Sequence, residues 1–259
     1  MIANIDLDIA VYQIGSACDG KYWEYKGQRW DNKTLLNREL KRDGITDDGV
    51  LCGKEPEPFE KVKETLITFY ENLSRYLDCD TQGWLSGKGN FRYSKATIQP
   101  YKGNRVSVEK PFHYDSIRQF FVDVYDAKLS SDMEADDAIG LSHNSEEDVI
   151  ATIDKDLNCI PGLHYNWVTN SCSWITELEA NKNFFKQVLI GDTTDNILGL
   201  YSVGKDSQLV KNVFSMTDVE EMKLYVIKEY QKRFGSYWNI FYQETCELVW
   251  ILQKRECPK

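Results

Sequence analysis

The sequence predicts an α/β fold in which a mainly parallel central sheet is flanked by helices and followed by a C-terminal helical module. Short apolar, strand-like runs alternate with helical patterns, as in parallel strands joined by crossover helices. Carboxylates cluster where several of these runs end. We expect an α/β core at residues 1–185, including a basic segment at 87–111, and a helical module at 186–259 with a hairpin at 191–212.

The first half of the chain divides into short elements. Residues 2–18 read as a strand and a helix, residues 22–30 as a hairpin, and residues 33–43 as a short helix. Residues 44–57 are rich in Gly, Asp and Pro, which predicts a loop. Residues 59–77 keep apolar side chains at helical spacing and predict an amphipathic helix.

The second half continues the alternation of strands and helices. The expected elements are strands near 82–86, 127–130 and 148–153, helices near 114–124 and from Glu134 onward, a hairpin at 164–176, and a mostly helical tail from about 177 that is interrupted between Gly191 and Gly204. No internal repeat is present.

Composition narrows the class of protein. The chain has 259 residues, of which 42% are apolar, and no run of about 18 apolar residues predicts a membrane span. No secretory signal is visible at the N-terminus. The 7 cysteines form no C-x-x-C pair and the 3 histidines are scattered, which argues against zinc and fits reduced thiols. We therefore expect a cytoplasmic protein.

Acidic residues follow strand-like runs at several places. The eight acids are Asp6, Glu134, Asp136, Asp137, Asp154, Asp156, Asp192 and Asp195. The last two follow the strand-like run Val188-Leu189-Ile190-Gly191. Carboxyl ends of parallel strands line one crevice, where so many negative charges repel one another unless cations lie among them. Carboxylates are the hard ligands that Mg²⁺ or Mn²⁺ prefers. The pattern predicts a two-metal phosphoryl-transfer site.

Each acidic cluster also has an ordinary explanation. The acids from Glu134 onward open a helix and complement its dipole. Asp154 and Asp156 suit a polar turn, Asp192 and Asp195 suit a turn or helix cap, and a strand-end acid such as Asp6 can bond to the next helix. The combination of four clusters at four run ends favours a common site.

A basic segment offers contacts for nucleic acid despite the net charge of -10. The eight acids account for most of that excess, and Lys88 begins a run of local positive charge. In Tyr101-Lys102-Gly103-Asn104-Arg105, bases can stack on Tyr101 while Lys102 and Arg105 hold phosphates, with Asn104 as a further contact. A solvated basic loop is the alternative.

A glycine-containing segment follows the last acid pair. In Gly199-Leu200-Tyr201-Ser202-Val203-Gly204 the glycines allow backbone amides to approach a phosphate, and a helix starting near Gly204 would add its dipole. Lys205 adds a positive charge. We expect Gly199, Gly204 and Lys205 to bind DNA, with a plain helix–helix turn as the alternative.

The order of these motifs resembles the 5′-3′ exonuclease/flap endonuclease family, most closely its phage members, including exonucleases of short-tailed phages. The resemblance runs from Asp6 to about Lys211 and includes the Tyr101–Arg105 block. It implies a nuclease core related to PIN domains and a helix-hairpin-helix-type module that grips duplex DNA.

The resemblance also implies roles for individual residues. Asp6, Glu134 and Asp136 fall at the first metal position, and the other five acids fall near the second. Lys102 and Arg105 match gateway residues that contact the scissile phosphate, and Arg92 matches another. The segment from Gly199 to Gly204 matches a duplex-binding hairpin at which the family often places K⁺.

Two positions depart from the family pattern. Gly87 stands where many members carry an aspartate, which predicts weaker metal affinity or altered metal preference, because water would fill the missing ligand position. Gln187 stands where some members have a lysine that contacts phosphate.

The sequence therefore predicts a 5′-3′ exodeoxyribonuclease that uses two Mg²⁺ ions, with Mn²⁺ as a substitute, on duplex DNA. RNA primers or RNA–DNA hybrids are further substrates to consider, and phage replication proteins are expected partners. The alternatives are a structure-selective 5′ flap endonuclease, a PIN-type ribonuclease, and a non-catalytic DNA-binding relative, which Gly87 makes conceivable.

Overall fold

The computed structural model describes residues 1–44, 49–107 and 109–259. The chain divides into two compact units. The first comprises Met1–Ile9, Leu77–Val108 and Asp126–Lys259, and the second comprises Ala10–Tyr76 and Glu109–Tyr125. The expected boundary at residue 185 does not coincide with this division, because it falls inside a helix of the first unit.

A six-stranded sheet in the order β6-β5-β1-β7-β8-β9 organises the first unit. Its strands are β1 (Ile2–Asp6), β5 (Asp80–Leu85), β6 (Lys128–Leu129), β7 (Val149–Ala151), β8 (Gly162–Asn166) and β9 (Ser171–Ile175). All neighbouring pairs are parallel except β8 with β9, which is antiparallel. The predicted mainly parallel α/β fold is confirmed.

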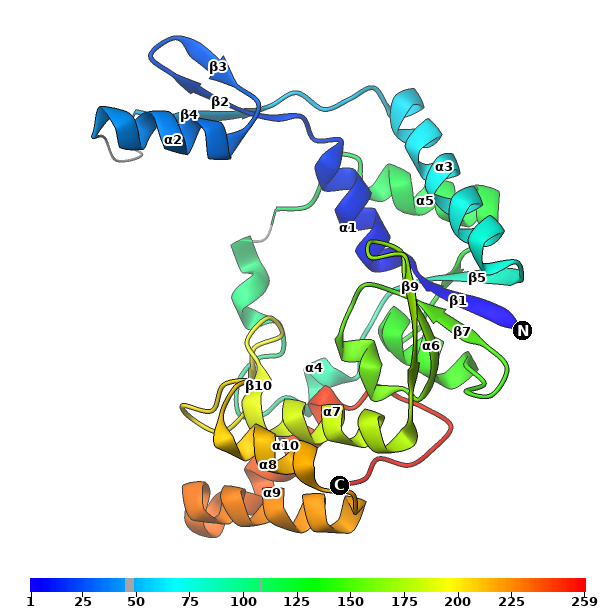
Figure 1. Ribbon diagram of the computed structural model, residues 1–259, viewed down its shortest axis with the longest axis vertical. Coiled ribbons are helices and arrows are strands. Elements are labelled where there is room, and N and C mark those ends of the chain that lie inside the picture. The colour runs from blue at the N-terminus through cyan, green and yellow to red at the C-terminus, as the bar shows by residue number, and fades with distance from the viewer. Residues whose placement is uncertain (45–48, 108) are drawn as a thin grey trace. The chain divides into compact units, whose positions relative to one another are not determined.

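The middle strands are buried, which explains their continuous apolar sequence. Ala3, Ile5 and Ile150 have no exposed surface, as expected for parallel strands covered on both faces. β1 lies between β5 and β7 (Figure 1), so Asp6 at its last position shares an edge with the residues that follow both neighbours.

Helices cover the sheet and continue into the C-terminal part. These helices are α4 (Arg92–Lys95), α6 (Ala135–Ser142), α7 (Glu177–Ile190), α8 (Gln208–Ser215), α9 (Val219–Phe234) and α10 (Trp238–Val249), with 3-10 turns η1 (Gly103–Ser107), η2 (Asp156–Cys159) and η3 (Gly235–Tyr237). α6 packs on β1 and β5. The run from Val188 to Ile190, expected to be a strand, is the last turn of α7, because a short apolar run fits either element.

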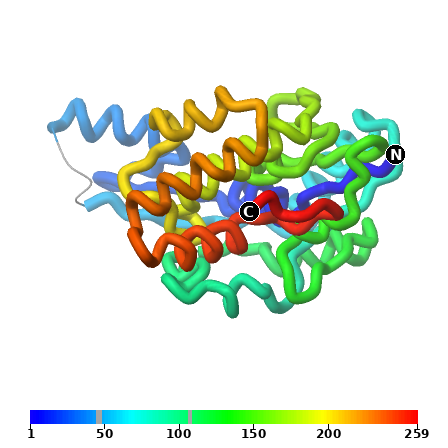
Figure 2. Tube along the Cα trace, turned by 90° about the horizontal axis from the view of Figure 1, so that it is seen from below, coloured from blue at the N-terminus to red at the C-terminus, as the bar shows by residue number. Residues whose placement is uncertain are grey.

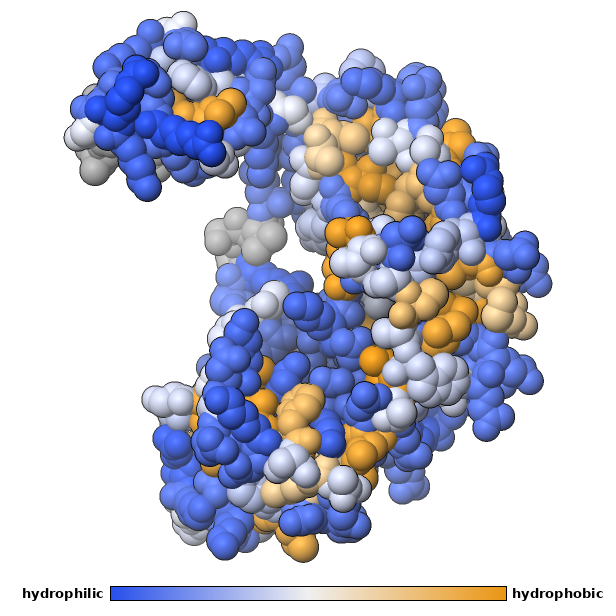
Figure 3. All heavy atoms as spheres, viewed as in Figure 1, coloured by the Kyte–Doolittle hydropathy of each residue, from blue (hydrophilic) through white to orange (hydrophobic). Residues whose placement is uncertain are grey.

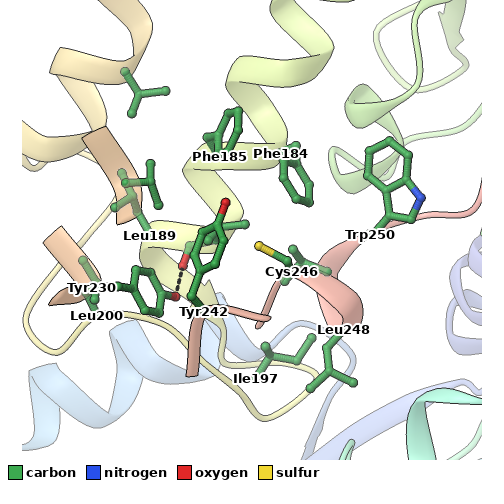
Figure 4. Close-up of a cluster of buried hydrophobic side chains, with 14 of the residues drawn as sticks. Phe184, Phe185, Leu189, Ile197, Leu200, Tyr230, Tyr242, Cys246, Leu248 and Trp250 are labelled. Atoms are coloured by element: carbon green, nitrogen blue, oxygen red, sulfur yellow. Dashed lines mark hydrogen bonds between the residues drawn. The ribbon is translucent and has the colours of Figure 1, made fainter. Parts of the chain in front are cut away.

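The C-terminal helices share one hydrophobic core. Phe184 and Phe185 of α7 face Tyr242 and Cys246 of α10 (Figure 4), and all four side chains are buried. The Tyr230 hydroxyl donates to the Val188 carbonyl oxygen at 2.6 Å, which satisfies the phenol inside this core. The mostly helical tail is confirmed, whereas a helix-hairpin-helix arrangement stays a prediction.

The chain after α10 returns to the sheet. Ile251 packs with Ile139 of α6 and Ile150 of β7, and Figure 2 shows this red segment running from the helices back toward the N-terminal strand. The C-terminal segment thus helps to fix α6, whose first turn carries Glu134 and Asp136.

The second unit contains helices and a small sheet of three antiparallel strands. Its elements are the larger part of α1 (Leu7–Ala17), β2 (Lys21–Tyr25), β3 (Gln28–Trp30), α2 (Lys33–Asp43), β4 (Leu51–Lys54), α3 (Phe59–Leu77) and α5 (Tyr114–Tyr125). The expectation of a loop at 44–57 is wrong at β4, which pairs with β2; residues 45–48 lie outside the described residues. The part built by β2–β4 and α2 exposes a mainly hydrophilic surface (Figure 3).

Among the helices that the structure describes, none is long and apolar enough to span a membrane.

Replacing Phe184 by Ala should lower the free energy of unfolding by about 3–5 kcal/mol, because it empties a fully buried aromatic site beside Phe185 and Trp250. Phe214→Ala is the matched control, since Phe214 is 42% exposed and should change the free energy by less than about 1 kcal/mol. Urea denaturation measures both. Equal effects of the two substitutions would contradict this packing.

His164 should make stability depend on pH. Its Nε2 lies 2.8 Å from the Ile160 carbonyl oxygen, and its buried Nδ1 has no hydrogen-bond partner among the described residues. Burial lowers the pKa of His164 to about 4. Because the pKa of His164 is lower in the folded protein than in the unfolded chain, the neutral side chain favours folding fully above about pH 6.5. As the pH falls to 4, the free energy of unfolding should decrease by about 3 kcal/mol.

The variant His164→Gln keeps a donor for Ile160 and removes the titration. Between pH 7 and pH 4, the free energy of unfolding of the wild type should therefore decrease by about 3 kcal/mol more than that of the variant. A difference that is independent of pH would show that His164 does not resist protonation.

Candidate active site

Asp6 is buried and is the last residue of β1. Its carboxylate is 3% exposed, accepts a hydrogen bond from the Thr152 hydroxyl at 2.9 Å, and accepts the Ile9 backbone N–H at 3.3 Å. Burial, together with repulsion from Asp8, raises the pKa of Asp6 to about 7. A negative charge here is costly unless a cation compensates it.

The first turn of α6 holds three acids in two different roles. Glu134 is the N-cap and forms a capping box with Asp137, as the ordinary explanation expected. Asp136 does not take part in the capping box. Desolvation, followed by repulsion from Asp6 and Asp154, raises the pKa of Asp136 well above its usual range. Asp136 is therefore close to the acids of β1 and β7.

The turn after β7 supplies the next two acids. The Asp156 backbone N–H donates to Asp154 Oδ1 at 2.9 Å, so the predicted polar turn is also present. Burial and repulsion from Asp154 raise the pKa of Asp156 to about 6. Gln187 Nε2 donates to Asp156 Oδ1 at 2.6 Å, so Gln187 orients a carboxylate here.

Asp192 and Asp195 come from a small hairpin and not from the central sheet. The strands β10 (Gly191–Asp192) and β11 (Ile197–Leu198) pair antiparallel after α7. Asp192 Oδ1 accepts the N–H groups of Thr194 at 2.7 Å and Asp195 at 3.2 Å. Both acids repel Asp156, so the expected convergence occurs although the expected strand is wrong.

Basic side chains of the Tyr101–Arg105 block bond to these acids. Lys102 pairs with Glu134 and lies 3.8 Å from Asp195, and Arg105 pairs with Asp195. The Lys102 backbone N–H donates to the Asp195 carbonyl oxygen at 2.8 Å. The predicted phosphate-binding cations therefore lie beside the predicted metal ligands.

Tyr101 has a different place from the one expected. It is 3% exposed, and its hydroxyl donates to Glu134 Oε2 at 3.0 Å and Asp195 Oδ2 at 2.7 Å. A buried ring cannot stack on a base, so that prediction is wrong; Tyr93, 60% exposed, is the accessible aromatic next to it. Asn104 Nδ2 donates to the Thr193 carbonyl oxygen at 2.6 Å and ties the block to the hairpin.

Arg92 and Asp137 form a buried ion pair. The two bonds measure 2.5 and 2.8 Å, and Arg92 also donates to the carbonyl oxygens of Leu248 and Trp250. Asp137 Oδ1 further accepts the Leu252 N–H at 2.9 Å. The side chains of Arg92 and Asp137 are 3% and 0% exposed, and they join α6 to the C-terminal segment. The predicted roles of Arg92 at a phosphate and of Asp137 at a metal have no support in the structure.

The segment from Gly199 to Gly204 lines an open cavity of about 420 Å³ beside the hairpin. A Cβ at Gly199 would overlap the backbone of Ile190 and Gly191, whereas Gly204 has open space around it. The expected helix start near Gly204 is wrong, because α8 begins at Gln208. Gly204, Lys205 and Lys88 are exposed, and their DNA contacts stay predictions.

Residue 87 has no room for the acid expected there. A Cβ at Gly87 would overlap the Ser130 carbonyl oxygen. Nearby, the Asp8 carboxylate accepts the Ser86 N–H at 2.9 Å. Asp8 is not among the acids that the sequence analysis identified, and its position two residues after Asp6 was the available signal.

The acids fit a hard divalent cation by chemistry. They are oxygen ligands, and burial together with mutual repulsion raises the pKa values of Asp6 and Asp156, an effect that a bound cation would oppose. Glu134, Asp136, Asp156, Asp192 and Asp195 line a cavity of about 40 Å³, room for about three waters. Among the described residues, no three His, Cys, Asp or Glu side chains are arranged as a metal-binding group. Several of the carboxylates instead form the hydrogen bonds and ion pairs described above.

Known proteins resemble this chain in structure only. No protein-family model matches it, and no curated protein does. The fold is that of phage 5′-3′ exonucleases and flap endonucleases, which confirms, at the level of fold, the resemblance found in the sequence.

Two solved structures from bacteriophage T5 carry this conclusion. The D15 protein co-crystallised with metal ions has a TM-score of 0.55 and 13% identity, covering 96% of this chain and 88% of that chain. A variant of the D15 flap endonuclease, in a pseudo-enzyme–product complex with DNA and metal ions, has a TM-score of 0.53 and 14% identity with the same coverage.

Arg92→Leu should lower the free energy of unfolding by about 3–5 kcal/mol, because it leaves the fully buried Asp137 without its cation. Lys95→Ala is the control in the same helix; Lys95 is exposed and its ion pair should contribute less than about 1 kcal/mol. Denaturant titration measures both. An Arg92→Leu protein with wild-type stability would contradict this structural role of Arg92.

Proposed function

We propose that this protein is a divalent-metal-dependent 5′ nuclease that hydrolyses phosphodiester bonds at the 5′ end of duplex DNA. The observation that carries the proposal is the meeting of buried carboxylates from β1, α6 and the turn after β7 with Lys102 and Arg105 at one edge of the sheet. The fold shared with the T5 structures supports the same class of reaction.

The acids fall into two groups that share Asp154. Asp6 and Asp136 repel each other and Asp154. Asp156 is repelled by Asp154, Asp192 and Asp195. Each group would hold one cation, Mg²⁺ or Mn²⁺ by ligand type. When bound, such ions lower the pKa of an attacking water and stabilise the leaving oxygen.

The chain's own cations would bind and orient the phosphate. Lys102 and Arg105 come from one short segment and contact different oxygens of the Asp195 carboxylate. A phosphodiester entering the site would take over these donors, and they would neutralise the charge that develops on its non-bridging oxygens. The Tyr101 hydroxyl would hold Glu134 and Asp195 in place through its hydrogen bonds to both carboxylates.

Other residues hold the carboxylates of the site in position. The buried Arg92–Asp137 pair fixes the first turn of α6, and Gln187 orients Asp156. These side chains position carboxylates and do not reach the substrate.

The test is cleavage of a 5′-labelled duplex and a matched 5′-flap substrate with Mg²⁺, Mn²⁺ or EDTA. We expect short 5′ products with either metal and none with EDTA. Asp136→Asn and Asp154→Asn should reduce the cleavage rate by at least about 100-fold and leave DNA binding intact, because several kcal/mol of transition-state stabilisation depend on the cations.

Asp206→Asn is the control, since Asp206 is exposed and outside both acid groups. The better substrate decides between exonuclease and flap endonuclease action. Cleavage that persists in EDTA would refute the proposal, and DNA binding with no cleavage in either metal would favour the non-catalytic relative.

A further inference from the structure

We propose that Tyr93 stacks on an unpaired base of the DNA strand whose phosphate Lys102 and Arg105 hold, an inference that rests on the proposed nuclease function. It adds to that function the state of the substrate, because a strand that stacks on Tyr93 is single-stranded beside the active site.

Tyr93 is the accessible aromatic ring of the basic segment at 87–111. That segment carries three aromatic side chains, of which Tyr101 is buried, Phe91 is half-buried and Tyr93 is 60% exposed. A single exposed aromatic side chain is ordinary on a protein surface. The surroundings of Tyr93 therefore decide whether it has a role.

The Tyr93 ring borders the proposed active site through Tyr101. The two ring centroids are 5.6 Å apart and the ring planes meet at 75°. The Tyr101 hydroxyl bonds to Glu134 and Asp195, and Lys102 Nζ lies 5.2 Å from the centroid of the Tyr101 ring. A phosphate held by Lys102 and a base on Tyr93 would thus contact groups around the same side chain.

The helix that carries Tyr93 is fixed before DNA binds. The Arg92 side chain donates to the Leu248 carbonyl oxygen at 2.9 Å, and the Ile98 N–H donates to Glu244 Oε1 at 2.9 Å. These bonds tie both ends of the segment around α4 to α10. Because the backbone at Tyr93 is already ordered, stacking on its ring would cost little additional ordering.

The geometry of stacking selects an unpaired base. Inside a duplex, neighbouring base pairs cover both faces of each base, so only a terminal or unpaired base can offer a face to a protein ring. Every base has such a face, and stacking therefore tolerates any sequence. Tyr93 would thus favour the structure of a substrate and not its sequence, as a 5′ nuclease requires where the end of the strand leaves the duplex.

The test is a double-mutant cycle between the ring and the base. Binding of a duplex with a single-stranded 5′ arm is measured with Mg²⁺ in the Asp136→Asn protein, which is expected to bind DNA without cleaving it. Tyr93→Leu in this protein should weaken binding by about 5- to 100-fold. An abasic nucleotide at one position of the arm should weaken binding to the same extent, and the two changes together should cost no more than either alone.

Two further variants isolate the aromatic ring. Tyr93→Phe keeps the ring and should bind every substrate as Tyr93 does. Tyr237→Leu is the matched control, because Tyr237 is 66% exposed and lies in η3 outside the basic segment. It should bind the intact arm like the unchanged protein and stay sensitive to the abasic nucleotide.

The outcomes separate this inference from the proposed function. Tyr93→Leu that binds like the unchanged protein, or that loses the same factor with intact and abasic arms at every position, would overturn the inference alone; the second result would leave Tyr93 as packing for Tyr101. A wild type that neither binds nor cleaves DNA with Mg²⁺ or Mn²⁺ would overturn the proposed function and the inference with it.

Discussion

Repulsion among carboxylates at one edge of the central sheet is the constraint on which the rest of this structure depends. The sheet brings Asp6 and Asp154 to that edge from neighbouring strands, and α6 adds Asp136. Burial, followed by repulsion from Asp8, raises the pKa of Asp6 to about 7. Buried like charges of this kind cluster at functional sites, and hydrolysis assisted by cations is the chemistry that we propose for them.

The basic residues around this cluster divide by burial. Arg92 lies inside, where its pairing with Asp137 and two carbonyl oxygens joins α6 to the C-terminal segment. Lys102 and Arg105 lie on the accessible side, with side chains 20% and 39% exposed. Arg92 therefore serves the scaffold, whereas Lys102 and Arg105 are accessible to the phosphate in the proposed function.

The spacing of apolar residues predicted most of the helices and strands, because this spacing differs between strands and amphipathic helices. It failed where a run was short: residues 188–190 end a helix and residues 51–54 form a strand within a glycine-rich stretch. The acids of the site were predicted by type and order, but their partners were not. The burial of Tyr101 and Arg92 depends on contacts with Glu134 and Leu248, far away in sequence.

The most direct test of the central claim is anomalous diffraction from crystals soaked in Mn²⁺ at neutral pH. The account predicts two manganese peaks, each within about 2.5 Å of carboxylate oxygens, one beside Asp6 and Asp136 and one beside Asp156. An absence of manganese at these carboxylates, with Lys102 still bonded to Glu134, would contradict the claim that the acids gather to hold cations.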